Sequence, residues 1–328
     1  MNFRTQVELP EKEVKICHAE RIMRWGSCFV ENIGKLLLEN KFRCVVNPLG
    51  ILYNPICIAE SLQEVLIKKV YEEKDLFHSG GMWHSWMHHS DFSSSSSENC
   101  LKRINGNLSM TAESLSDTDW LVVTWGTAYV YYLQQTQSIV GNCHKQSEKL
   151  FIRKRLEVGE IVEVWKRLLS DLKTFRPQLK VLFTVSPIRH AKDGMHGNQL
   201  SKSVLLLAVD ELCKTSPDCY YFPSYEIVMD ELRDYRFYAD DMLHPSTKTV
   251  EYIWECFCRC YFSKETMGII KEWKDIKKGV EHKPFAPESE AYRKFLSQIV
   301  LKITQIKEKF PYLEVQKELE LCESRLKM

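Results

Sequence analysis

Two short segments contain residue types that together could catalyse acyl transfer. Gly26-Ser27 lies where an expected strand gives way to an expected helix, and Asp241 and His244 lie three residues apart in a turn-rich loop. A serine nucleophile needs a base within hydrogen-bond reach, and that base needs a third group that fixes its tautomer. Ser27, His244 and Asp241 could fill these roles. Each half also has a structural explanation, because serine is a favoured helix N-cap and an Asp-x-x-His pair can simply hold a loop.

Short β-like runs alternate with amphipathic helices along most of the chain. The patterns predict strands over residues 21–25, 120–125, 180–185 and 219–222, and helices over 29–40, 160–175, 199–215 and 245–261. Such alternation implies crossover connections and a mostly parallel central sheet, covered by helices on both faces. We therefore predict an α/β fold. Open sheets of this kind bind ligands at the carboxyl ends of their strands, which is where Ser27 is expected.

The composition changes after residue 263, where Lys and Glu dominate. A helical stripe runs through residues 292–306, and Pro311 restarts a second apolar pattern. We divide the chain into a catalytic domain, residues 1–263, and a charged C-terminal helical hairpin, residues 264–328. The hairpin either packs on the core or forms a homodimer with a second copy; both interpretations stay open.

Composition and charge narrow the class of protein. Hydrophobic residues make up 44% of the 328, which is too many for a disordered chain. Lys and Arg total 45 against 44 Asp and Glu, and neither a basic excess nor a basic stripe suggests a nucleic-acid partner. No apolar run approaches the roughly 18 residues that a membrane span needs. With no secretory signal recognisable near residue 1, we expect a cytoplasmic protein without a membrane partner.

The cysteines and histidines suggest a metal site only weakly. The 12 cysteines are scattered without a Cys-x-x-Cys pair, and we favour core packing for them over a metal or redox role. His84 and His88 are spaced one helical turn apart, but Ser85 stands where a zincin motif needs glutamate. We predict neither a metal nor another cofactor. A metal-dependent hydrolase built on the two histidines is a remote alternative.

The segment Gly26-Ser27-Cys28-Phe29-Val30 resembles the motif that names the GSCFA family of bacterial proteins, whose last letter is alanine where this chain has Val30. The resemblance covers roughly residues 15–262 and leaves the charged tail outside. It continues, in the same order, through residues 47–55, 126–128, 142–145, 186–190 and 241–244.

The GSCFA family looks like a branch of the SGNH, or GDSL-like, hydrolases. The resemblance implies a three-layer α/β/α sandwich similar to flavodoxin, and ester hydrolysis or acyl transfer through serine. It makes Ser27 the nucleophile, His244 the general base and Asp241 the orienting acid. In the SGNH pattern a glycine after the second strand and an asparagine after the third complete the oxyanion hole. Gly50 matches the glycine.

The oxyanion asparagine has no counterpart in the matching block, where Ala128 follows Thr127. Losing one oxyanion donor can cost roughly 100- to 1000-fold in rate. Either Thr127, Asn142 or Asn54 replaces it, or the chemistry is weakened. The N–H groups of Ser27 and Gly50 are the other expected donors.

The sequence therefore favours a serine esterase that hydrolyses an O-acyl ester on a small molecule or a glycan. An acyltransferase of the same fold is one alternative, and a non-catalytic binding or scaffold protein with an impaired oxyanion hole is another. Arg189, His190 and His144 are candidate substrate-binding residues. Arg189 and His190 follow a strand end, where they could bind an anionic substrate group or hold loops in place.

Overall fold

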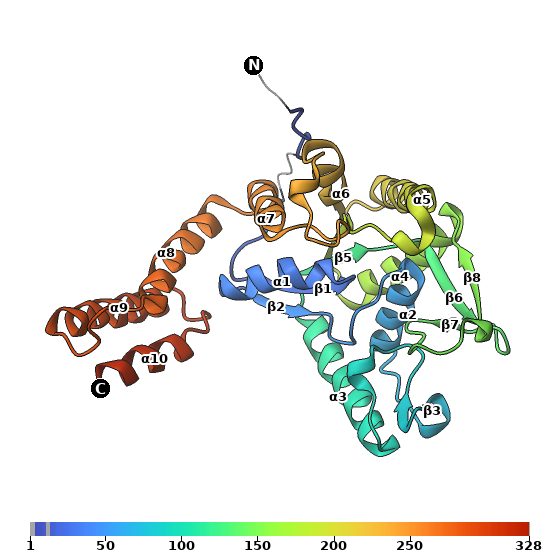
Figure 1. Cartoon of the computed structure of the whole chain (residues 1–328), viewed down its shortest axis with the longest axis horizontal. Coiled ribbons are helices and arrows are strands. Elements are labelled where there is room, and N and C mark those ends of the chain that lie inside the picture. The colour runs from blue at the N-terminus through green and yellow to red at the C-terminus, as the bar shows by residue number, and fades with distance from the viewer. Residues whose placement is uncertain (1–3, 11–13, 328) are drawn as a thin grey trace.

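The computed structural model describes residues 4–10 and 14–327, and its centre is a parallel five-stranded sheet (Figure 1). The strand order β10-β9-β5-β1-β2 is the flavodoxin order. In this order β2 lies on one side of β1, and the later strands β5, β9 and β10 follow one another on its other side. The predicted α/β fold is thus confirmed. The strands are β1 (Arg21–Gly26), β2 (Arg43–Val46), β5 (Trp120–Trp125), β9 (Lys180–Val185) and β10 (Cys219–Phe222).

Helices cover both faces of this sheet, as the crossover connections require. Helices α2, α3, α4 and α5 bury their apolar sides against one face, whereas α1 and α7 lie on the other. No helix of the described residues is long and apolar enough to cross a membrane. The helices of this part are α1 (Phe29–Glu39), α2 (Pro55–Leu66), α3 (Ser97–Ser116), α4 (Val158–Phe175), α5 (Gly194–Thr215), α6 (Ser224–Glu226) and α7 (Thr247–Tyr261).

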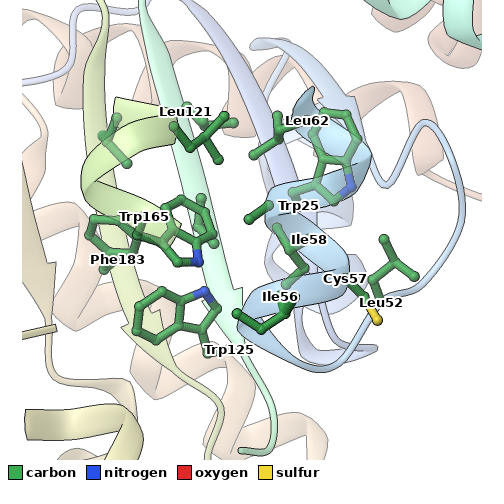
Figure 2. Packing of buried hydrophobic residues seen from close by; sticks show 14 of the residues in the cluster. Trp25, Leu52, Ile56, Cys57, Ile58, Leu62, Leu121, Trp125, Trp165 and Phe183 are labelled. Atoms are coloured by element: carbon green, nitrogen blue, oxygen red, sulfur yellow. The ribbon is translucent and has the colours of Figure 1, made fainter. Parts of the chain in front are cut away.

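Large aromatic side chains fill the core beneath α2 and α4 (Figure 2). Trp125, the last residue of β5, packs edge-to-face on Trp165 with ring centroids 5.3 Å apart, and Phe183 of β9 lies 5.1 Å from each ring. The indole N–H of Trp165 donates to the carbonyl of Pro55 at 3.0 Å. This packing fixes the end of β5 relative to the start of α2.

Two small antiparallel sheets lie beside the central one. The first is the pair β3 (Phe77–Ser79) and β4 (Met82–His84), and the second joins β6 (Tyr129–Leu133), β7 (Ile139–Val140) and β8 (Phe151–Arg155). Strand β6 follows β5 after only three residues, so the second small sheet begins at the carboxyl edge of the central sheet.

The C-terminal region forms α8 (Lys264–Glu281), α9 (Glu290–Lys309) and α10 (Gln316–Leu326), which extend from the α/β body in Figure 1. The predicted hairpin was therefore wrong in omitting α8. That helix is rich in Lys and Glu, and its apolar side is centred on buried Trp273. The Trp273 indole donates to the Glu39 carbonyl at 2.8 Å, and Lys41 pairs with Glu318 at 2.7 Å. These contacts dock the helices on α1 and the loop after it, while a homodimer stays a prediction.

Candidate functional site

A tight turn joins β1 to α1 at the carboxyl edge of the sheet. Gly26 has φ of 142°, and a β-carbon there would lie 2.1 Å from the carbonyl oxygen of Thr124 on β5. Only glycine tolerates this backbone conformation and this close approach. The N–H of Ser27 also donates to the Thr124 carbonyl, at 3.3 Å. The turn is consequently held against the end of β5.

Ser27 is buried in this turn, with 1% of its surface exposed. Its Oγ is enclosed, and no group of the described residues forms a hydrogen bond with it. The N-cap position of α1 is occupied by Cys28, without a side-chain hydrogen bond. Ser27 therefore does not cap the helix through its side chain, and the structural explanation considered for it from the sequence does not apply.

Asp241 and His244 lie in contact in the loop before α7. Asp241 Oδ2 is 2.5 Å from His244 Nδ1, and Asp241 Oδ1 accepts from the N–H groups of Leu243 and His244, both at 2.9 Å. These two N–H donors, together with the imidazole, lower the pKa of Asp241 to about 2. The ionised carboxylate favours the tautomer with hydrogen on Nδ1, so Nε2 presents a lone pair. The arrangement suits a general base, and the catalytic roles of both residues stay a prediction.

The Nε2 atom of His244 lies 3.9 Å from the thiol sulfur of Cys28, within the range of a hydrogen bond to sulfur. Cys28 is partly exposed. Burial raises the pKa of the Cys28 thiol, and the Glu31 carboxylate adds to the rise; the N–H groups of Cys28 and Phe29 and the Lys202 ammonium oppose it. The structure thus brings His244 into contact with the residue after the predicted nucleophile.

Arg189 holds the Asp241–His244 loop in place. Its backbone N–H donates to the Leu243 carbonyl at 3.3 Å, and its guanidinium donates to the carbonyl of Met242. The guanidinium also lies over the ring of Tyr238, 4.4 Å from the ring centre. Of the two roles considered from the sequence, these contacts support the one in which Arg189 fixes loops.

His190 lies near Ser27, on the other side of Gly126. A β-carbon at Gly126 would be 3.3 Å from Ser27 Cβ, 3.5 Å from His190 Nε2 and 3.1 Å from the Tyr53 carbonyl, so these groups surround one point. Burial lowers the pKa of His190 to about 4, and the Lys202 ammonium contributes. A neutral imidazole therefore faces the turn, and the role of His190 in substrate binding stays a prediction.

The Lys202 side chain extends from α5 to the ends of β5 and β9, and 1% of its surface is exposed. Its Nζ donates to the carbonyls of Gly126 at 2.6 Å and Ser186 at 2.7 Å, which follow β5 and β9. Burial lowers the pKa of Lys202 to about 7. One buried amine thereby links the ends of the neighbouring strands β5 and β9, next to the candidate site.

Two of the expected oxyanion donors already have partners. The N–H of Gly50 donates to the Asn47 carbonyl at 2.9 Å. The Thr127 hydroxyl lies 3.2 Å from Ser201 Oγ and accepts from the N–H of Tyr129 at 3.1 Å. Within the described residues, neither group forms a hydrogen bond with the Ser27 side chain.

The asparagine candidates and His144 likewise have structural partners. Asn54 caps α2, where its Oδ1 accepts from the N–H of Cys57 at 2.9 Å and its Nδ2 donates to the Cys57 sulfur at 3.1 Å. The Asn142 Oδ1 accepts from the N–H of His144 at 2.8 Å. His144 is buried, and its Nε2 contacts the Ser85 carbonyl at 2.8 Å. These contacts give each residue a role in holding loops.

The two histidines considered for a metal have hydroxyl partners instead. His84 Nδ1 lies 2.7 Å from Ser93 Oγ, and His88 Nδ1 lies 2.9 Å from Ser85 Oγ. Burial lowers the pKa of His88 to about 3. In the part of the chain that the structure describes, no three His, Cys, Asp or Glu side chains gather as a metal-binding group.

Sequence reasoning missed three residues of this site. Cys28 was assigned to core packing together with the other cysteines, and Gly126 and Lys202 were given no role. Lys202 carries a recognisable signal, because it falls on the buried face of α5 with Asn198, Leu205 and Val209. A lysine on an apolar helix face needs polar partners, which here are the two strand-end carbonyls.

The flavodoxin-type strand order defines an α/β protein, and an Asp–His pair lies beside the turn after β1 at the carboxyl edge of its sheet. The chain belongs to the GSCFA family, whose model matches residues 21–257, and the identification made from the sequence is confirmed. A model described as GSCFA domain protein, C-terminal domain, matches residues 273–328. From the sequence, the charged tail was left outside the resemblance. The match over residues 273–328 shows that most of this tail also corresponds to a GSCFA model.

Three solved structures are similar to this chain at low sequence identity. A provisionally assigned platelet activating factor from Streptococcus pneumonia is 10% identical, with a TM-score of 0.39, over 74% of this chain and 83% of that one. A carbohydrate esterase family 3 protein from Talaromyces cellulolyticus is 8% identical, with a TM-score of 0.35, over 77% and 99%. The acetyl xylan esterase Est2A from Butyrivibrio proteoclasticus is 10% identical, with a TM-score of 0.37, over 77% and 66%. A comparison with curated protein sequences gives no match.

Proposed function

We propose that this protein cleaves an O-acyl ester through an acyl-enzyme intermediate, on a small molecule or a glycan. The observation that carries the proposal is the 2.5 Å contact between Asp241 and His244, with His244 Nε2 directed at the turn after β1. A carboxylate that fixes an imidazole beside a nucleophile-bearing turn is the arrangement that acyl transfer requires. No cofactor enters the proposed reaction.

In the proposed reaction, His244 accepts the proton of a nucleophile in the turn, and the nucleophile attacks the ester carbonyl. Asp241 keeps hydrogen on Nδ1 and stabilises the imidazolium that forms. His244 then protonates the leaving alcohol, and water releases the acyl group. The sequence-based hypothesis gives the nucleophilic role to Ser27, whose Oγ would have to turn toward His244 from its buried position.

Hydrolysis of p-nitrophenyl acetate by the purified chain tests the proposal. We expect His244→Ala to reduce kcat/KM by at least about 1000-fold, since the base is lost. His282→Ala, which changes a histidine at the end of α8, is the matched control and should keep the wild-type rate. A folded wild-type protein that cleaves neither this ester nor acetylated oligosaccharides would favour the binding or scaffold alternative.

The same assay separates a hydrolase from the alternative acyltransferase. Both would form the same acyl-enzyme, and they differ in whether water or an alcohol accepts the acyl group. We expect added sugar alcohols to leave the release of p-nitrophenol and acetate in a ratio of one to one. An acetylated sugar appearing at the expense of free acetate would support the transferase.

A further inference from the structure

We infer that Cys28, rather than Ser27, supplies the nucleophile of this site. The inference rests on the proposed function, because it assigns a role within that reaction. It follows from three features of the turn after β1: the direction of the His244 imidazole, the different exposure of the two side chains, and the position of the unpaired backbone N–H groups.

The direction of the imidazole distinguishes the two neighbouring residues. His244 Nε2, the nitrogen left without hydrogen by the Asp241 contact, lies 3.9 Å from Cys28 Sγ. Ser27 Oγ has no hydrogen-bond partner in the described residues. A base must lie within hydrogen-bond reach of the proton that it removes. Cys28, His244 and Asp241 are therefore already linked by successive contacts. The Ser27 side chain would have to rearrange before it could contact His244.

Exposure favours the same residue. Ser27 is 1% exposed and its Oγ is enclosed, whereas Cys28 is partly exposed. The His244 side chain is 47% exposed, so the space around its imidazole is open to an incoming molecule. A nucleophile has to reach a substrate carbonyl, and only the thiol of Cys28 lies on this open side of the turn.

The backbone N–H groups provide the third argument. The N–H of Ser27 is bonded to the Thr124 carbonyl, so it is not free for an oxyanion. The N–H groups of Cys28 and Phe29, at the N-terminus of α1, lie close enough to Cys28 Sγ to favour its thiolate, and neither donates to a backbone carbonyl of the described residues. Donors at a helix N-terminus stabilise the negative charge that develops on an attacked carbonyl oxygen. These two backbone N–H groups therefore lie beside the thiol.

The reaction balances without an oxidant or reductant. The thiol proton passes to His244 Nε2, and the sulfur forms a bond to the ester carbonyl carbon. The ester C–O bond then breaks, and the alcohol leaves with the proton from His244. Water, deprotonated by His244, attacks the resulting thioester; the C–S bond breaks, the acid is released, and the thiolate recovers the proton. Because burial raises the pKa of Cys28, the thiol is neutral at rest and depends on His244 as base.

Matched variants of the two neighbours test this inference. We expect Cys28→Ala to lower kcat/KM for p-nitrophenyl acetate by at least about 1000-fold. Ser27→Ala should cost less than about tenfold, through the loss of a buried hydroxyl alone. Cys17→Ser, which changes an exposed thiol, is the control. If Ser27→Ala abolishes turnover in folded protein while Cys28→Ala retains it, the inference is wrong.

A second measurement does not depend on an ester substrate. The rate of iodoacetamide alkylation, followed peptide by peptide, reports thiol activation directly. We expect Cys28 to react at least about tenfold faster in the wild type than in His244→Ala, with Cys17 in the same digest unchanged. Equal Cys28 rates in the two proteins would overturn the inference. Fast, His244-dependent alkylation without turnover of any ester would support the activated thiol and count against ester cleavage instead.

Discussion

The ammonium of Lys202 donates to the Gly126 carbonyl at 2.6 Å, although the side chain is almost completely buried. Gly126 is also the residue around which Ser27, Tyr53 and His190 meet. Lys202 therefore holds the Gly126 carbonyl in place next to the candidate site. It does so with an ammonium group whose charge is costly to bury. Its protonation should be visible in the stability of the protein.

Lys202→Met should change how stability depends on pH. An unfolded lysine has a pKa near 10.4, whereas burial lowers the pKa of Lys202 to about 7. Between these values the unfolded chain binds more protons than the folded one, so the free energy of unfolding rises with pH, by up to about 1.4 kcal/mol per unit. Below pH 7 both forms are protonated, and this contribution is flat.

Denaturant unfolding of both proteins between pH 6 and about pH 10 measures the effect. We expect the stability of the wild type relative to Lys202→Met to increase as the pH rises above 7, because the variant lacks the titrating group. A difference that stays constant over this range would show that Lys202 keeps an ordinary pKa in the folded protein.

Gly26→Ala should prevent stable folding. The added β-carbon would lie 2.1 Å from a backbone oxygen of β5, and the φ of 142° is unfavourable for alanine. We expect a loss of at least about 3 kcal/mol in unfolding free energy, or no folded protein. Gly106→Ala is the matched control, because Gly106 lies within α3 with open space around it, and should be slightly stabilising. Similar unfolding midpoints for the two variants would contradict the account of the turn.

Arg189→Met should reduce kcat through the position of His244. The guanidinium donates to the Met242 carbonyl, and its loss frees the loop that contains Asp241 and His244. Small displacements of a catalytic base are costly, and we expect roughly a tenfold to 100-fold lower kcat. The fall should be the same for neutral and anionic esters. A higher KM confined to anionic esters would instead assign Arg189 to substrate binding.

The sequence was most informative where burial is complete. The ranges 120–125, 180–185 and 219–222 coincide with strands β5, β9 and β10, because unbroken apolar runs between turn residues suit buried parallel strands. Helix α8 was not predicted, since its many Lys and Glu residues obscure the stripe formed by Ile269, Trp273 and Ile276. That stripe is buried against α9 and α10, and Trp273 also contacts the end of α1; a local pattern does not reveal these contacts.

The candidate site could be located from the sequence, but not resolved to single atoms. The Asp241–His244 contact follows from a three-residue spacing in a loop, and the structure shows it. Which of two adjacent residues faces His244 depends on the backbone of Gly26, because successive residues at a strand–helix turn point in different directions. Gly50, Asn54 and Asn142 bond to groups two or three residues away, in turn and helix-cap contacts that a residue type alone does not reveal, whereas Thr127 contacts Ser201 of α5, which is distant in sequence.

Trapping the acyl-enzyme tests the central claim most directly. The wild-type protein is mixed with p-nitrophenyl acetate, quenched in acid before the first turnover is complete, and analysed by intact mass and peptide mapping. We predict one acetyl group, on Cys28, removed by neutral hydroxylamine as a thioester is, and absent from His244→Ala. An acetyl group on Ser27, or turnover without any acylated residue, would contradict the account.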